Sequence, residues 1–280
     1  MSVDDRLRMS AATQAVVSVA VERWQGATRS STAFADEVAV ESPLEVRVGD
    51  ESLATTMRTP GHDEALVAGL LWAEGLLSSP KQLLGVETQP SPAHTLGAGD
   101  VAVATLAGDV DRSAWQRAKR GSLTSASCGV CGRGAIDDLV AALVPVLPLP
   151  SLDIAMLARL PEALREHQTV FTKTGGLHAA AVVDVTGAVL SAHEDVGRHN
   201  AVDKAIGQLV LQASVPAPGH ILIVSGRTSF EIVQKAIRAG VSAVVGVSAP
   251  SSLAVELATA FRLVLIGFAR NGDCNLYTRP

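Results

Sequence analysis

The chain has 280 residues, of which 48% are apolar, and this size allows one large domain or two modest ones with a full hydrophobic core. Its 23 Lys and Arg against 28 Asp and Glu give a net charge of −5, which argues against a protein that coats a polyanion such as nucleic acid. With three Trp, one Tyr and five Phe, stacking platforms for single-stranded nucleic acid are not expected. Three cysteines are too few for a secreted disulfide framework and indicate a reducing compartment.

The beginning of the chain does not resemble a targeting segment. Residues 1–6 are acidic where a secretory signal would be basic. The longest apolar run, Leu139–Leu149, contains two prolines and is too short to span a bilayer. We therefore expect a cytoplasmic protein that does not contact a membrane.

The N-terminal half predicts a small β-containing unit. Alternating apolar and polar residues over 36–58, with a Gly-Asp turn at 49–50, are typical of a β-hairpin. Apolar residues at helical spacing from His62 predict a helix that ends near Pro80, because proline cannot continue it. Val101–Leu106 is expected to be a further short strand.

The last third predicts an α/β sheet, because short apolar runs alternate with helical patterns. The expected strands and helices, in chain order, are 221–224, 228–238, 243–247, 251–261 and 263–268. Two earlier runs, Ala179–Val185 and Ala188–Ala192, are expected to pair as a hairpin on this sheet. We expect an N-terminal extension (1–30), an N-terminal subdomain (31–135) and an α/β subdomain (136–280), with a Pro-rich linker at 145–150.

The loops that leave these three strands are candidates for ligand binding, since open α/β sheets bind ligands at the carboxyl ends of their strands. Ser225–Ser229 and Ser248–Ser252 each open a helix with small hydroxyl residues, and free backbone N–H groups there favour anions. The third loop, Phe268–Asp273, contributes a second arginine, Arg270, in addition to Arg227 of the first loop. Together the loops predict a nucleotide-bearing ligand, although the Ser and Thr residues can instead be ordinary helix caps.

A C-x-x-C motif, Cys128 and Cys131 with glycines after both cysteines, is the sharpest chemical feature. A structural zinc site lacks a second cysteine pair, since Cys274 is the one other thiol. A thioredoxin-like dithiol would follow a strand, and buried inert cysteines would not need flanking glycines. The remaining interpretation is a nucleophilic thiolate exposed on a loop, which accepts sulfur and passes it on. The nearby Lys119, Arg120 and Arg133 favour the thiolate form.

A third polar cluster combines His178 with the segment His193–Asn200. His178 opens one strand of the predicted hairpin and His193 closes the other, so both imidazoles are expected at the same end of the sheet. Asp195 is a candidate N-cap of the following helix, and Asp203 lies one turn from His199, so part of the cluster has a structural reading. The rest can orient a ligand or move protons.

Five segments together resemble the formate dehydrogenase accessory sulfurtransferase family, FdhD. They are Met57–Glu64, Ser127–Gly132, Thr174–Ala180, His193–Asn200 and Ser225–Glu231, and they occur in the family's order. The resemblance runs from about Asp36 to Tyr277, which is nearly the whole chain.

The resemblance implies a sulfur carrier. It implies that a cysteine desulfurase loads a persulfide on Cys128, with Cys131 as a relay or resolving thiol. The sulfur would then pass to a molybdenum bis(guanine dinucleotide) cofactor, bound as substrate through its guanine nucleotide part, before insertion into formate dehydrogenase. It also implies a cytidine deaminase-like fold and a homodimer, with no permanently bound metal. The residues expected to bind the cofactor are His178, His199, Ser225, Gly226, Arg227, Phe268, Ala269, Arg270, Asn271, Gly272 and Asp273.

Two other functions remain open from the sequence. A zinc-dependent deaminase-like hydrolase would use an H-x-E motif, which His62-Asp63-Glu64 supplies, with the C-x-x-C pair, but Ser127 replaces the expected proline. A non-catalytic molybdenum-cofactor chaperone would hold the guanine dinucleotide for its client and would not need Cys128.

Overall fold

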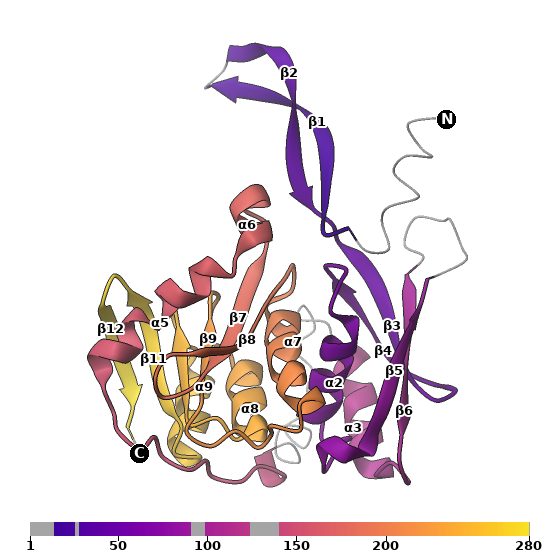
Figure 1. The fold of residues 1–280 in the computed structure, drawn as a ribbon, viewed down its shortest axis with the longest axis vertical. Coiled ribbons are helices and arrows are strands. Elements are labelled where there is room, and N and C mark those ends of the chain that lie inside the picture. The colour runs from indigo at the N-terminus through magenta and orange to yellow at the C-terminus, as the bar shows by residue number, and fades with distance from the viewer. Residues whose placement is uncertain (1–13, 26–27, 91–98, 124–139, 280) are drawn as a thin grey trace.

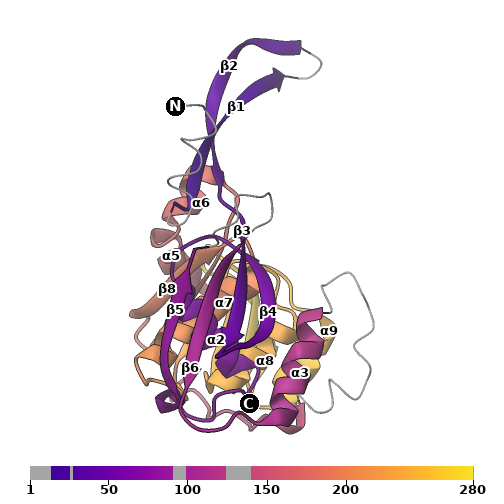
Figure 2. The same ribbon diagram turned by 90° about the vertical axis from the view of Figure 1, so that its right-hand side faces the viewer.

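The computed structural model describes residues 14–25, 28–90, 99–123 and 140–279. The described residues form three β-sheets with helices between and around them (Figure 1). A two-stranded sheet pairs β1 (Val16–Gln25) with β2 (Thr28–Ala39) as an antiparallel arm that projects from the body (Figures 1 and 2). Residues 36–39, which alternation assigned to the next hairpin, therefore belong to β2. A period of two identifies a strand but does not identify its partner.

The second sheet has four strands in the order β4-β3-β6-β5. Its strands are β3 (Ser42–Val48), β4 (Glu51–Arg58), β5 (Leu83–Gln89) and β6 (Asp100–Leu106). The predicted hairpin at turn 49–50 is confirmed as β3–β4, and the predicted strand 101–106 is confirmed as β6. β5, which follows a short 3-10 helix (Pro80–Gln82), was not predicted.

Helix α2 (Asp63–Ala73) confirms the predicted helix but ends earlier than expected. Glu74 is its C-cap and Gly75 adopts a left-handed conformation (φ 75°), which ends the helix before Pro80 is reached. Helix α3 (Arg112–Leu123) follows β6.

The third sheet has six strands in the order β12-β11-β10-β9-β7-β8. The predicted run of strands and helices is confirmed as β9 (Ile221–Val224), α8 (Phe230–Ala239), β10 (Ala243–Gly246), α9 (Ser252–Ala260) and β11 (Val264–Arg270). The strands of this run are parallel, while the confirmed hairpin β7 (His178–Val183) and β8 (Val189–Asp195) and the unpredicted β12 (Asp273–Thr278) are antiparallel to their neighbours. The protein is thus a mixed α/β protein.

The two larger sheets are stacked with helices between them (Figure 2). Helices α5 (Ile154–Glu166) and α6 (Thr169–Thr174) follow one another along the chain, and α5 packs on one face of the six-stranded sheet. Helix α7 (Arg198–Leu211), α8 and α9 cover the other face, and α2 lies between α7 and the four-stranded sheet. One hydrophobic cluster runs through these layers, from Leu44 of β3 to Leu265 of β11.

Helices α2 and α7 cross in very close contact at two glycines. A Cβ on Gly69 would lie 1.9 Å from the carbonyl oxygen of Asp203, and a Cβ on Gly207 would lie 1.8 Å from that of Ala65. Glycine at both positions therefore lets the two backbones approach, and this contact joins the N-terminal and C-terminal halves of the chain.

The predicted linker at 145–150 is irregular but fixed to the C-terminal sheet. Val146 is buried and its N–H donates to the carbonyl of Phe261. The hydroxyl of Ser242 donates to the carbonyl of Leu147. The subdomain boundary at 135/136 lies outside the described residues and stays a prediction.

Candidate functional site at the strand ends

The three predicted loops meet at the carboxyl ends of β9, β10 and β11. The N–H of Thr228 donates to the carbonyl of Ala249, and the N–H of Ser251 donates to that of Thr228. The N–H of Phe268 donates to the carbonyl of Ser248, which links the second and third loops. The expectation that these loops converge on one rim is therefore confirmed.

A cavity of about 410 Å³ opens beside these loops. His178, Ser225 and Val247 line it from the sheet edge, and Arg165, Gln168 and Phe171 line it from α5, α6 and the residues between them. This is the volume range of small-molecule and cofactor sites. His178 reaches the cavity because β7 runs antiparallel to β9, so that the first residue of β7 lies where β9 ends.

Ser225 and Gly226 hold His178 in this position. The N–H of Ala179 donates to Ser225 Oγ at 2.9 Å, and the N–H of Ser225 donates to the carbonyl of Ala179 at 3.0 Å. A Cβ on Gly226 would lie 3.2 Å from His178 Nδ1, so glycine leaves room for the imidazole. His178, Ser225 and Gly226, predicted from separate segments, thus lie together.

His199 lies at the start of α7 and contacts the start of α8. Its Nε2 is 3.4 Å from Ser229 Oγ, and this hydroxyl donates to Glu231 at 2.6 Å. Burial, followed by the charges of Lys235 and Arg198, lowers the pKa of His199 to about 4. Burial and nearby arginines also lower the pKa of His178. Both imidazoles are therefore neutral at pH 7, which suits hydrogen bonding to a ligand better than proton exchange near neutrality.

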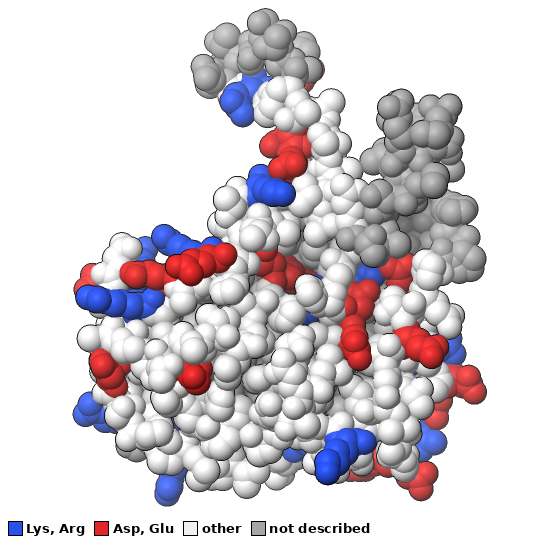
Figure 3. All heavy atoms as spheres, in the orientation of Figure 1, with Lys and Arg blue, Asp and Glu red and all other residues white. Residues whose placement is uncertain are grey.

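Arginine supplies the positive charge of the site. Arg227 is exposed on the first loop, as expected. Arg198, which was not predicted from the sequence as a site residue, lies next to Gly226. Its Cβ is 3.7 Å from the place where a Cβ on Gly226 would be. Its Nε is buried with no hydrogen-bond partner among the described residues. On the face shown in Figure 3, positive and negative side chains are interspersed without a broad basic patch.

The stretch Phe268–Asp273 is divided by the structure and is not one loop. β11 continues to Arg270, and a tight turn leads directly into β12, with Asn271 and Gly272 at positive φ. Ala269 is fully buried among the residues that pack against α5, so its side chain contributes to the core. Phe268 is 40% exposed beside the second loop, and Arg270, Asn271 and Asp273 are exposed at the turn. None of the residues Phe268–Asp273 lines the cavity.

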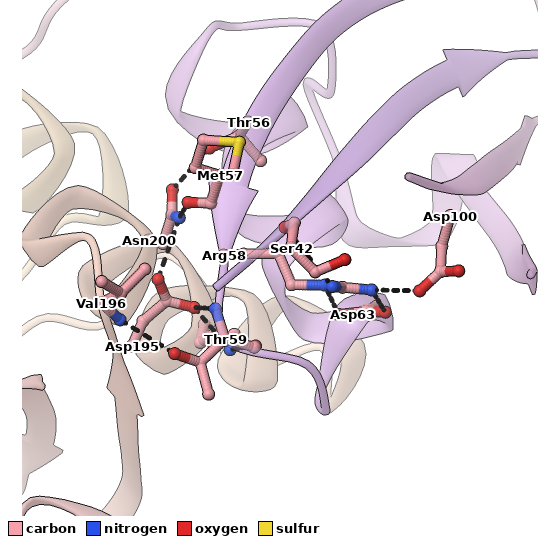
Figure 4. A network of polar contacts seen from close by, with 11 residues as sticks. Ser42, Thr56, Met57, Arg58, Thr59, Asp63, Asp100, Asp195, Val196 and Asn200 are labelled. Carbon is pink, nitrogen blue, oxygen red and sulfur yellow. Dashed lines mark hydrogen bonds and ion pairs between the residues drawn. The ribbon is translucent and has the colours of Figure 1, made fainter. Parts of the chain in front are cut away.

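Asp195 links the segments Met57–Glu64 and His193–Asn200, which are far apart in the sequence (Figure 4). It accepts hydrogen bonds from the N–H of Thr59, the N–H of Gly197 and the side-chain amide of Asn200, and pairs with Lys204 at 2.7 Å. The prediction that Asp195 caps α7 is wrong, because Gly197 is the N-cap residue. A carboxylate with four partners instead joins the start of α7 to the end of β4.

The other charged groups around this network are also paired. Arg58 is fully buried and binds both Asp63 and Asp100. Asp203 pairs with Lys235 at 2.7 Å and not with His199, because its side chain is buried between α7 and α8.

A second pair of histidines, His62 and His193, lies next to this network. Their rings are in edge contact with centroids 4.6 Å apart. His193 is 8% exposed, and burial, followed by the charges of His62 and Lys204, lowers its pKa to about 4. Burial likewise lowers the pKa of His62.

We expect folding stability to fall as the pH drops from about 6.5 to 5. In this range the unfolded chain binds a proton at His193 while the folded protein excludes it, so this buried group costs up to about 1.4 kcal/mol per pH unit. Urea unfolding at several pH values measures the slope, and His193→Gln is expected to reduce it. A stability that is constant between pH 7 and 5 would contradict the expectation.

The C-x-x-C motif lies outside the described residues, so the predicted roles of Cys128 and Cys131 stay predictions. The third thiol, Cys274, is half-buried on β12, and burial raises its pKa, which disfavours the reactive thiolate. Among the described residues there is no group of three His, Cys, Asp or Glu side chains placed to hold a metal ion. No helix in the described part of the chain is long and apolar enough to cross a membrane.

The fold and this site define a mixed α/β protein with a cavity of about 410 Å³ at its strand ends. Residues 39–280 match the FdhD/NarQ family model, and the chain belongs to this family. The β1–β2 arm lies almost entirely outside the matched residues.

Curated relatives and a solved structure agree with this membership. The chain is 43% identical over 251 residues to the sulfur carrier protein FdhD of Nocardia farcinica, with 87% of this chain and 86% of the relative covered. It is 45% identical over 258 residues to the sulfur carrier protein FdhD of Anaeromyxobacter dehalogenans, with 89% of each covered. A crystal structure of a candidate formate dehydrogenase accessory protein from Desulfotalea psychrophila has the same fold, with a TM-score of 0.74 at 20% identity over 95% of this chain and 98% of that one.

Proposed function

We propose that this protein is a sulfur carrier that serves formate dehydrogenase. It takes persulfide sulfur from a cysteine desulfurase and transfers it to the molybdenum bis(guanine dinucleotide) cofactor before that cofactor enters the enzyme. The family and the names of its relatives support the carrier role. The observation that supports binding of the cofactor is the strand-end cavity, where His178 and Ser225 meet beside Arg198 and Arg227.

The carrier step is a sulfurtransferase reaction at Cys128. Its thiolate attacks the outer sulfur of the persulfide on the desulfurase, the sulfur–sulfur bond of that persulfide breaks, and the desulfurase thiolate leaves. Cys128 then carries the persulfide, and no net oxidation or reduction occurs. Cys131 acts as a relay or resolving thiol.

The cofactor binds as a substrate through its guanine nucleotide part. In this proposal neutral His178 and His199 and the backbone of the first loop form hydrogen bonds with the nucleotide, and Arg198 and Arg227 bind its phosphates. Phe268 is placed at the edge of the site, and the exposed turn from Arg270 to Asp273 would contact a part of this large substrate that extends beyond the cavity. We further propose a cytidine deaminase-like relationship of the fold, a homodimer and a cytoplasmic location.

Intact-mass spectrometry after incubation with a cysteine desulfurase and cysteine tests the carrier role. We expect one added sulfur atom on the wild-type protein, retained in Cys131→Ala and in the control Cys274→Ala, and lost in Cys128→Ala. If Cys128→Ala still accepts sulfur and Cys131→Ala does not, the assignment of the carrier thiol is wrong. If Cys128→Ala supports full formate dehydrogenase activity in cells, the protein is a cofactor chaperone and not a carrier.

Glu194 is expected to matter for nucleotide binding although it does not line the cavity. Helix α6 has no capping side chain of its own, and Glu194 accepts from the N–H groups of Val170 and Phe171 at 2.8 and 2.7 Å. It thereby fixes the wall that carries Gln168 and Phe171. Glu194→Gln leaves one of these two acceptors, and we expect guanine nucleotide affinity to fall about tenfold while sulfur loading is unchanged.

Calorimetric titration with a guanine nucleotide measures this effect. The matched control is Asp184→Asn, because Asp184 also accepts backbone N–H groups but lies at the opposite end of the same hairpin. Equal nucleotide affinity in wild type and Glu194→Gln would show that α6 does not form a wall of the binding site.

A further inference from the structure

A second cavity, of about 330 Å³, lies at the C-terminal ends of α2 and α8. The N-terminus of α8 belongs to the strand-end site, while Arg238 in its last turn lines the second cavity, about 12 Å further along the helix axis. The end of α2, the side of α3 and residues 142–143 complete its walls. None of the residues assigned to sulfur or cofactor chemistry lines it.

Two arginines line this cavity without a direct ion pair to a described carboxylate, although the charge of Arg117 acts on both Glu74 and Asp111. Arg238 donates to the carbonyls of Trp72 and Leu77 and lies 5.8 Å from the centre of the Trp72 ring, so its guanidinium is held in place. Arg117 on α3 donates to Ser113 Oγ. Neither forms an ion pair with a carboxylate of the described residues, and the charge of Arg117 contributes to lowering the pKa of Arg238. An anionic group between them would relieve this repulsion.

The carboxyl group of Glu74 lines the same cavity. Glu74, the C-cap residue of α2, makes no hydrogen bond or ion pair with any described side chain. Burial raises the pKa of Glu74, and the charges of Lys235 and Arg117 offset this effect only in part. It also lies at a helix C-terminus, where the helix dipole favours a cation.

The mixture of charges decides the chemical class of the ligand. A simple anion would meet Glu74 together with Asp109 and Asp111 at the rim, and a simple cation would meet the two arginines. A small zwitterion satisfies both sets of groups at once. We propose that this cavity binds a free α-amino acid, with its carboxylate between Arg117 and Arg238 and its ammonium group at Glu74.

The apolar part of the wall limits the side chain of this amino acid. Leu76, Ala142 and Leu143 line the cavity beside the charged groups. The ligand is therefore an amino acid with a small or medium apolar side chain. The site does not depend on the proposed sulfur carrier function, since it shares no residue with the strand-end site or the C-x-x-C motif.

The test is calorimetric titration of the full-length protein with each of the twenty amino acids, supported by thermal unfolding. We expect apolar members of the set to bind and to raise the melting temperature. Arg117→Gln and the isosteric Glu74→Gln are each expected to weaken binding about tenfold or more, since each removes one charged partner. The control Arg112→Gln, on the same helix but paired with Glu51 at the surface, is expected to bind like wild type.

Modified ligands separate the possible outcomes. The N-acetyl derivative of the best amino acid lacks the ammonium group. We expect it to bind the wild-type protein more weakly than the free amino acid does, and to bind Glu74→Gln about as tightly as the free amino acid does. If phosphate or chloride binds as tightly as any amino acid, the cavity is an anion site and the proposal is wrong. If no amino acid binds at millimolar concentration, or if Arg117→Gln binds as wild type does, the proposal is also overturned.

Discussion

Replacing Asp195 with alanine is expected to destabilise the protein by about 3–5 kcal/mol, because it leaves a buried charge without its partner. Lys204 is 1% exposed and would retain only the carbonyl of Thr59 as an acceptor. The N–H groups of Thr59 and Gly197 and the amide of Asn200 would lose their acceptor as well. Urea unfolding at pH 7 measures the change in the free energy of unfolding.

An exposed ion pair of nearly equal length provides the matched control. Arg112 and Glu51 are 2.9 Å apart, but their side chains are 75% and 50% exposed. Glu51→Ala is therefore expected to change stability by less than about 1 kcal/mol. The double variant Asp195→Ala/Lys204→Met should recover part of the loss, since it removes the unpaired charge. A loss at Asp195 no larger than that at Glu51 would show that the Asp195–Lys204 pair is not structurally important.

Replacing Gly207 with alanine is expected to cost about 3 kcal/mol, even though alanine favours helices more than glycine does. The new Cβ would lie 1.8 Å from the carbonyl oxygen of Ala65 and 2.6 Å from the N–H nitrogen of Gly69. Both are backbone atoms, so no side-chain rotation relieves the clash and the helices must separate. Thermal and urea unfolding measure the loss.

Gly85→Ala is the control for this prediction. Gly85 lies on β5, and a Cβ there would meet nothing within 4 Å. Its replacement should leave stability unchanged or slightly higher, because alanine reduces the entropy of the unfolded chain. If Gly207→Ala is as stable as Gly85→Ala, the two helices are not as closely packed as the structure shows.

The parallel part of the six-stranded sheet was predictable because its strands are buried on both faces. Continuous apolar runs such as Ile221–Val224 and Ala243–Gly246 alternate with helical patterns, and one topology accounts for that order. β5 and β12 were missed because they are partly exposed and carry polar residues without a regular alternation, so no clear period marks them. β1 was missed because its pairing with β2 forms an arm outside the core.

The candidate site was partly predictable for a similar reason. Strand ends follow from strand positions, so the convergence of Ser225, Ser248 and Phe268 could be inferred. The role of Asp195 could not be inferred, because a carboxylate close to the start of a helix usually caps it, and the actual partners Thr59 and Lys204 come from other elements. The second cavity had no signal in the sequence, since Glu74, Arg117 and Arg238 belong to three separate helical segments.

The C-x-x-C pair, the order of strands and helices in the last third and the family could be recognised in the sequence alone, because each depends on residues that are close together in the chain. The partners of the buried polar groups depend on the tertiary structure. Burial makes an unpaired charge costly. Arg58 therefore pairs with Asp100, Asp203 pairs with Lys235, and Asp195 accepts a hydrogen bond from the N–H of Thr59, and these distant partners meet only when the two sheets and the helices between them have come together.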